Sequence, residues 1–197
     1  QQLNFDYILT AHHSDDNLET FLINFTRGTG LNGLTGIPEL NGNIARPLLP
    51  FSRETIEAYA KSENIVWRED SSNSSRKYLR NKLRHEVIPI LKEINPNVLD
   101  SFQNTLSNLK ETEAIVNQSI KDFLSKAILK KEGNTITYAV SEFKKQNNPK
   151  AFLFEAFKDC GFTEWNDIEG LLDAETGKYI VSNMHKLTKH REFLILT

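Results

Sequence analysis

A short apolar run that leads directly into a cluster of histidines and acids constrains the fold more than any other feature. Residues 5–11 (FDYILTA) are largely apolar, with aromatic and β-branched members, which is typical of a buried strand. The next residues, 12–16 (HHSDD), precede apolar residues spaced three and four apart, which predict a helix that begins near Ser14. Ser14 or Asp15 can cap this helix, and acids are favoured in its first turn. A strand that passes into a helix is the unit of an α/β fold, and functional groups gather at the carboxyl ends of such strands.

Glycines and prolines divide the rest of the first half into shorter elements. Residues 27–36 (RGTGLNGLTG) hold four of the nine glycines, which indicates a loop. Residues 44–49 predict a short extended piece, and Ser52 can cap a helix that runs to about residue 63. Residues 78–91 predict a further helix, in which Pro89 introduces a kink or an early end.

A break at Asn95-Pro96-Asn97 separates the two halves of the chain, and we predict domains at 1–95 and 96–197. The first would be α/β and the second a smaller, mostly helical α+β domain. The second domain is predicted to contain a long helical stretch at 98–130, helices at 149–159 and 163–172, and strands at 135–140, 179–182 and 192–196.

Composition narrows the classes of partner and compartment. The net charge of −2 provides no global positive field, so a nucleic-acid partner would need a local basic patch. Cys160 is the single cysteine, which excludes an internal disulfide and fits a reducing cytoplasm, where we place the protein. No apolar run reaches the ~20 residues of a membrane span, so we expect no membrane partner.

The segment AHHSDDNLET at 11–20 is the strongest candidate for chemistry. His12 and Asp16 are four residues apart, and Asp16 and Glu19 are three apart, so the two acids share one face of the predicted helix. Two carboxylates and an imidazole can bind Mg²⁺, hold an ammonium group or move a proton. The ordinary alternative is a helix start with capping acids and a hydrogen-bonded histidine, but the full pattern at a strand-to-helix junction favours a functional site.

A basic segment forms a second candidate. Residues 68–73 (REDSSN) precede RNKLR at 80–84, and Arg80 and Arg84 are four apart on one helical face. Arginine forks suit phosphate oxygens, although such a segment can also be a solvated basic face. The glycine-rich loop that begins at Arg27 could cradle phosphate with backbone amides, but it departs from the established phosphate-loop pattern.

Taken in order, these segments resemble the bacterial tRNA(Ile)-lysidine synthetase family. The resemblance covers roughly residues 5–100 and is more specific than any single motif. The matching segments are AHHSDDNLET, RGTGLNGLTGI, RPLL, WREDSSN and RNKLRHEVIPIL. The second half is less similar to the family and rests on GKYIVS and REFLIL.

The resemblance implies an ATP-dependent ligase for tRNA modification. In that family, ATP activates the C2 carbonyl of the wobble cytidine of tRNA(Ile) with a CAU anticodon. Free L-lysine then displaces AMP from this adenylated intermediate to give lysidine, and Mg²⁺ takes part. The implied fold is the C-terminal part of a Rossmann-like PP-loop (adenine nucleotide alpha hydrolase-like) domain, followed by a middle domain that contacts tRNA. The sequence does not decide whether the protein forms a homodimer.

The resemblance also implies roles for individual residues. His12 and Asp16 would lie at the ATP and metal site, while Glu19 and Asn73 would hold lysine or the reacting groups. Arg84 would face the α-phosphate or the RNA backbone. The predicted catalytic residues are His12, Asp16, Glu19, Asn73 and Arg84, the predicted nucleotide-binding residues are Arg27 and Arg80, and the predicted metal ligand is Asp16.

One departure from the family concerns its ATP loop. The family's S-G-G-x-D-S pattern has no match here, and neither does its C-terminal tRNA-binding domain. We therefore expect a fragment that has no ligase activity by itself.

Three alternatives remain at this level. A related PP-loop enzyme such as a tRNA thiolase would need more cysteines than Cys160. A metal-dependent phosphohydrolase could use HHxDD at 12–16 but would need further distant ligands. A non-catalytic tRNA-binding module would leave the acidic cluster unexplained.

Overall fold

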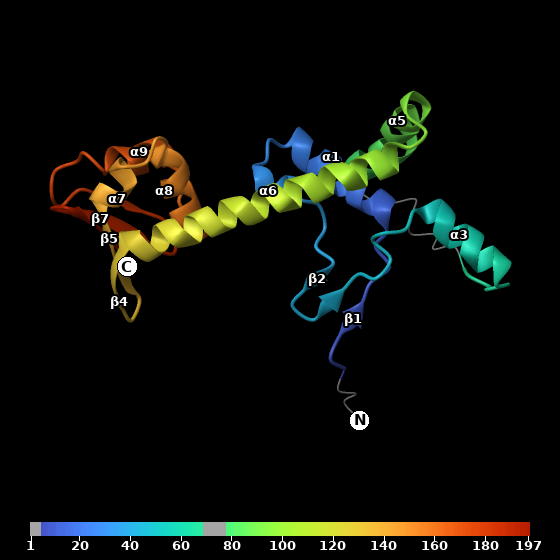
Figure 1. The fold of residues 1–197 in the computed structure, drawn as a ribbon, viewed down its shortest axis with the longest axis horizontal. Coiled ribbons are helices and arrows are strands. Elements are labelled where there is room, and N and C mark those ends of the chain that lie inside the picture. The colour runs from blue at the N-terminus through green and yellow to red at the C-terminus, as the bar shows by residue number, and fades with distance from the viewer. Residues whose placement is uncertain (1–4, 69–77) are drawn as a thin grey trace. The chain divides into compact units, whose positions relative to one another are not determined.

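The computed structural model describes residues 5–68 and 78–197, which form two compact units (Figure 1). The units are Gln1–Glu113 and Ala114–Thr197. The division falls inside one long helix, α6 (Val98–Ala127), rather than at the Asn95–Asn97 break. The domain limits of 1–95 and 96–197 therefore stay a prediction. Along the described residues, no helix combines the length and apolar character that crossing a bilayer requires.

The first unit contains a small mixed sheet and a set of helices. The sheet has the order β1-β3-β2, with β1 parallel to β3 through the pairs Ile8↔Ile44 and Leu9↔Ala45, and β2 antiparallel to β3. The elements before α6 are β1 (Ile8–Leu9), α1 (Ser14–Thr26), α2 (Leu31–Leu34), β2 (Leu40–Asn41), β3 (Ile44–Ala45), α3 (Arg53–Ser62), α4 (Tyr78–Lys82), a π-helical segment (Leu83–Val87) and α5 (Ile88–Ile94).

The predicted buried strand at 5–11 is wrong in both extent and environment. Strand β1 covers only Ile8–Leu9, and these two side chains are 54% and 68% exposed. An apolar run shows that a strand has surface to bury, but it does not show that the covering partners are present. Here β1 has β3 as its neighbour in the sheet, and neither of its residues joins a hydrophobic cluster of the described chain.

The core of the first unit holds α1 against α5 and α6. Leu18, Ile88, Phe102 and Leu106 are buried together, and Phe21 meets the Phe102 ring edge-on at 5.3 Å between centroids. Burial of such side chains contributes about 1.5 to 3 kcal/mol each. This packing fixes the start of α1 relative to the segment that carries the basic residues.

A π-helical turn stands where the sequence predicted a kink at Pro89. Proline has no N–H, and its ring clashes with the carbonyl four residues earlier in a regular α-helix. The chain widens over Leu83–Val87, where the Ile88 N–H donates to the Leu83 carbonyl five residues back, and α5 then begins with Pro89 in its first turn. Single π turns of this kind are frequent at functional sites, and this one contains Arg84.

The second unit packs helices on one face of a five-stranded antiparallel sheet of order β4-β5-β8-β7-β6 (Figure 1). Its core is built around Phe143, Phe157, Leu187 and Leu194, all at 0% exposure. After α6 the elements are β4 (Ile128–Glu132), β5 (Thr135–Ala139), α7 (Val140–Lys144), α8 (Pro149–Phe157), a 3₁₀ turn (Lys158–Cys160), α9 (Trp165–Gly170), β6 (Tyr179–Val181), β7 (Lys186–His190) and β8 (Phe193–Leu196).

Two strands of this sheet were not predicted. Helix α6 ends at Ala127 instead of about Lys130, and β4 follows at once. Strand β7 (KLTKH) was not predicted because its two inward residues are Leu187 and Lys189. The sequence therefore lacks the alternation of apolar and polar residues that indicates a strand. Lys189 is buried because its ammonium group donates to the Leu172 carbonyl at 2.6 Å.

Candidate functional site

The N-terminus of α1 collects most of the candidate residues. His13 is the N-cap, with extended backbone, and its N–H donates to the Asp16 carboxylate at 3.1 Å. The cap is therefore one residue before the predicted Ser14 and two before the predicted Asp15. Ser14 is buried, and its hydroxyl accepts a hydrogen bond from the Gln103 amide on α6 at 2.9 Å. These contacts fix the first turn, which carries Asp15 and Asp16, and Glu19 follows in the next turn.

Glu19 is a fully buried carboxylate held by two arginines. Its Oε1 accepts from Arg84 Nε at 2.6 Å and its Oε2 from Arg84 Nη2 at 3.1 Å, so the pair is bidentate. Arg80 adds its Nε at 3.4 Å from Oε2, and its Nη2 donates to the Thr20 hydroxyl at 3.1 Å. The hydrogen bond with Glu19 raises the pKa of the Arg84 guanidinium above its ordinary value. We call Glu19, Arg80 and Arg84 the buried clamp.

Asp16 extends the clamp toward the histidine. Its Oδ1 lies 3.3 Å from Arg84 Nη2, and its Oδ2 lies 3.4 Å from His13 Nε2. The other ring nitrogen, His13 Nδ1, is buried, has no hydrogen-bond partner among the described residues, and lies 3.6 Å from Asp15. Within residues 5–68 and 78–197, no group of three His, Cys, Asp or Glu side chains is arranged to hold a metal.

Asp15 joins three elements. One oxygen accepts from the Arg53 N–H at the start of α3 (2.9 Å), and the other accepts from the Lys92 ammonium group on α5 (3.1 Å). Burial works to raise the pKa of the Asp15 carboxyl, but the hydrogen bonds from Arg53 and Lys92 outweigh it and hold the pKa below its ordinary value. Asp15 is thus a charged junction between α1, α3 and α5, whereas the sequence suggested it as a helix-capping acid or, in the phosphohydrolase alternative, as a metal ligand.

A cleft of about 470 Å³ opens beside these contacts. Its walls combine both signs of charge with a small apolar patch from Ile88 and Pro89. The charged lining residues are His13, Asp15, Glu19, Arg53, Arg84, Lys92 and Glu93. Cavities with a few convergent polar groups are the usual form of a small-molecule site.

The structure brings some of the predicted site residues together and separates others. Asp16, Glu19, Arg80 and Arg84 form one network. His12 instead shares a hydrogen bond with the Thr10 hydroxyl at 2.9 Å, and the imidazole that contacts the acids is that of His13. Both rings belong to the same HH pair, so spacing alone could not choose between them.

One further predicted residue lies elsewhere. Arg27 is exposed at the C-terminal end of α1. With 13 residues at about 1.5 Å each, it lies roughly 20 Å along the helix from Ser14. Asn73 lies outside the described residues. The catalytic and nucleotide-binding roles of all these residues stay predictions.

The glycine-rich loop is fastened to α1 by two asparagines. Asn17 accepts the Ile37 N–H at 2.7 Å, and Asn24 donates to the Gly33 carbonyl at 2.9 Å. Gly36 has φ +77°, and a Cβ there would lie 2.4 Å from Asn17 Oδ1. The loop folds into the short helix α2 against α1, and the described contacts do not bring it to the clamp.

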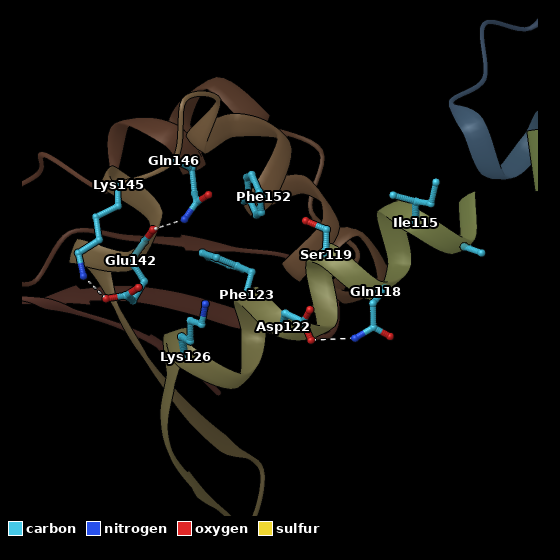
Figure 2. Close-up of a pocket in the computed structure, with 11 residues that line it drawn as sticks. Ile115, Gln118, Ser119, Asp122, Phe123, Lys126, Glu142, Lys145, Gln146 and Phe152 are labelled. Carbon is cyan, nitrogen blue, oxygen red and sulfur yellow. Dashed lines mark hydrogen bonds and ion pairs between the residues drawn. The ribbon is translucent and has the colours of Figure 1, made fainter. Parts of the chain in front are cut away.

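A larger hollow, of about 840 Å³, lies in the second unit (Figure 2). Phe123 and Phe152 are among its apolar residues, and its polar residues pair with one another: Gln118 with Asp122, and Lys145 with Glu142. Since acids and lysines alternate around it, the hollow presents no single charge to a ligand.

Comparisons with known proteins agree in both halves of the chain. The model of the PP-loop domain matches residues 1–91, and that of the TilS substrate binding domain matches residues 131–197. The tRNA(Ile)-lysidine synthase of Porphyromonas gingivalis is 34% identical over 197 residues, covering 98% of this chain and 42% of that protein. The chain belongs to the tRNA(Ile)-lysidine synthase family. The family and the fold class predicted from the sequence are thereby confirmed.

Other members of the family match to a similar extent. The tRNA(Ile)-lysidine synthase of Bacteroides thetaiotaomicron is 38% identical over 191 residues, which is 96% of this chain and 44% of the relative. That of Chlorobaculum tepidum is 34% identical over 186 residues, 91% of this chain and 56% of the relative. The chain thus spans about half the length of the synthases it matches, or less.

Proposed function

We propose that this chain is part of a ligase that attaches L-lysine to C2 of the wobble cytidine of tRNA(Ile) with a CAU anticodon. The reaction would consume ATP, release pyrophosphate, pass through an adenylated cytidine and release AMP as lysine attacks. The observation that carries the proposal is the buried clamp at the α1 junction, in a chain whose two halves match a PP-loop domain and the TilS substrate binding domain.

Arg84 is the residue best suited to a phosphate. Its Nε and Nη2 are committed to Glu19 and Asp16, whereas Nη1 has no partner among the described residues. A guanidinium held by two acids is oriented in advance, so its remaining N–H groups can face negative charge without reorganisation. With 28% of its side chain exposed, Arg84 reaches the cleft. The clamp therefore fits a nucleotide phosphate.

The clamp fits Mg²⁺ less well. Asp16 was the predicted ligand, but one of its oxygens faces Arg84 and the other faces His13. A metal ion bound at Asp16 would have to displace the guanidinium. Glu19 is 0% exposed, so we assign it the orientation of Arg84 rather than direct contact with lysine.

The Asp15 carboxylate lines the cleft and would accept a proton from the lysine ε-ammonium, because this amine must be neutral before it attacks. Attack of the lysine amine at C2 then forms the C–N bond. The C2–O bond to AMP breaks, and its electron pair leaves with AMP. The Asn73 contribution remains proposed from the family resemblance.

Mass spectrometry of tRNA tests the function. The complete polypeptide that contains this chain is incubated with ATP, lysine and a tRNA(Ile) transcript, and both AMP and lysidine are measured. Lysidine formation is expected from that polypeptide but not from residues 1–197 alone. Lysidine made by the 197-residue chain would refute the expectation that it is inactive, and no lysidine from the complete polypeptide would refute the function.

Arg84→Lys tests the clamp within this reaction. Lysine keeps the charge but loses the bidentate fork, so we expect lysidine formation to fall about a hundredfold. Arg27→Lys makes the same exchange at the other end of α1 and separates the predicted nucleotide-binding role of Arg27 from the predicted catalytic role of Arg84. Full activity in Arg84→Lys would show that the clamp takes no part in catalysis.

A further inference from the structure

One face of the five-stranded sheet has no helix over it. In the part of the chain that the structure describes, helices α7, α8 and α9 and the core they build lie on the other face (Figure 1). The alternation along β6, β7 and β8 sends every second side chain away from that core. We call these outward side chains of the three strands the outer sheet face: Tyr179, Val181, Lys186, Thr188, His190, Phe193 and Ile195.

The outer sheet face carries no acid. Strands β5, β6, β7 and β8 contain no Asp or Glu, whereas Lys186 and His190 lie on their outward side; Lys189 points into the core. Acids of this unit occur instead in the helices and turns on the other side, for example Glu142, Asp167 and Asp173. The acid-free part of this face is limited to β5, β6, β7 and β8, because Glu132 on β4 points to the same side through its pairing with Thr135. Such a local patch is the footprint expected for a polyanion.

An aromatic ring and a lysine are already organised on this face. The Lys186 ammonium group lies 4.1 Å from the centroid of the Tyr179 ring. Tyr179 is 56% exposed and Val181 is 60% exposed, although both lie on a regular strand. Thr188 lies beside Tyr179 in the strand register and Ile195 beside Thr188, so hydroxyl and apolar groups continue the surface across the sheet.

This chemistry fits RNA better than a protein partner. Lysine binds phosphate as a point charge, threonine can donate to phosphate or ribose oxygens, and an exposed aromatic ring on a sheet can stack a base or a ribose. The centres of protein interfaces are depleted in lysine, whereas here Lys186 lies over the ring of Tyr179. Three strands spaced about 4.8 Å apart give a platform roughly 10 Å across, which is enough for a few nucleotides.

We propose that the outer sheet face, centred on Tyr179 and Lys186, is a contact surface for the RNA backbone and an unstacked or terminal base of the tRNA. The proposal rests on the proposed function in one respect, namely that tRNA is the substrate. It assigns tRNA contact in the second unit to the sheet rather than to the helices or the hollow around Phe152.

Binding of a tRNA(Ile) transcript to the complete polypeptide, measured by fluorescence anisotropy over a series of salt concentrations, tests this surface. Lys186→Gln should weaken binding several-fold and lower the salt slope by about one. Tyr179→Ala should weaken binding by about five- to a hundredfold, while Tyr179→Phe retains the ring and the affinity. Lys126→Gln removes the same charge from α6, on the helix side, and should leave the affinity unchanged.

Each outcome decides the matter. Equal losses in Lys186→Gln and Lys126→Gln would overturn the proposal, because only net charge would matter. Unchanged binding in both Lys186→Gln and Tyr179→Ala would also overturn it, as would a concentration-dependent dimer that the two variants abolish. Lysidine formation is measured in parallel. If tRNA binding depends on Lys186 but no lysidine forms, the proposed function is refuted and the RNA-contact surface is not. If lysidine forms normally but tRNA binding does not depend on Lys186, the surface is refuted and the function is not.

Discussion

Replacing Glu19 by Gln should destabilise the first unit more than any other single charge removal at the α1 junction. The substitution keeps the side-chain shape but removes the charge that two arginines share. Loss of one member of a buried ion pair costs about 3 to 5 kcal/mol, because the remaining charge stays uncompensated. Arg84 and Arg80 keep 28% and 35% of their side chains exposed, and Arg84 retains Asp16. The lower limit, about 3 kcal/mol, is therefore the expected loss in the free energy of unfolding.

Hydrogen exchange measured by mass spectrometry can follow this loss locally. Amides of α1 should lose protection in Glu19→Gln, while those of β5 and β8 in the second unit keep theirs. For a unit of this size, about 3 kcal/mol corresponds to a fall of roughly 10 to 20 °C in melting temperature. Glu57→Gln is the matched control, since Glu57 pairs with Arg53 at 2.7 Å on the exposed surface of α3. Exposed pairs of this kind contribute little. A Glu19→Gln protein no less stable than Glu57→Gln would refute the view that burial gives the clamp its strength.

Two further predictions concern the same unit. The pKa of the Asp15 carboxyl is lower in the folded state than in the unfolded state. Its charge therefore stabilises the fold fully above the unfolded pKa, near 3.8. This stabilisation is lost as the pH falls through the lower folded pKa. Asp15→Asn should therefore be less stable than the wild type near pH 7, with the difference shrinking below about pH 4 in urea titrations, and a pH-independent difference would contradict the linkage. Gly36→Ala should be more destabilising than Gly42→Ala in thermal melts, because both positions have positive φ but only at Gly36 would the new Cβ collide with Asn17 Oδ1. Equal losses of stability in the two variants would show that the positive φ angle, and not the collision with Asn17, determines the cost of the substitution.

Local patterns predicted the helices of the first unit well. The spacing of Leu18, Phe21, Leu22 and Phe25 predicted α1, and Ser52 does cap α3, since its hydroxyl accepts the Thr55 N–H at 3.0 Å. These features follow from periodicity and capping, which act over a few residues. The pairing of Arg84 with Glu19 could not be predicted in this way, because it joins residues 65 positions apart.

The misassigned features depend on context that a linear pattern does not contain. The π turn widens the helix so that Pro89 can be accommodated, and it sets the direction of Arg84 at the same time. Whether His12 or His13 faces the acids depends on which of them becomes the N-cap. Burial of Lys189 depends on a carbonyl of residue 172, from a different element.

The two acids of the α1 junction therefore act mainly through the arginines. When the sequence is considered alone, a pair of carboxylates one helical turn apart indicates a metal-binding or proton-transfer site. In the fold, Glu19 has lost its access to solvent and Asp16 faces the same guanidinium, so their shared charge holds Arg84 in place. Because an arginine cannot lose its proton, this arrangement keeps a fixed positive charge beside the cleft over the whole physiological pH range. A fixed positive charge of this kind is what the proposed nucleotide phosphate would require of the junction.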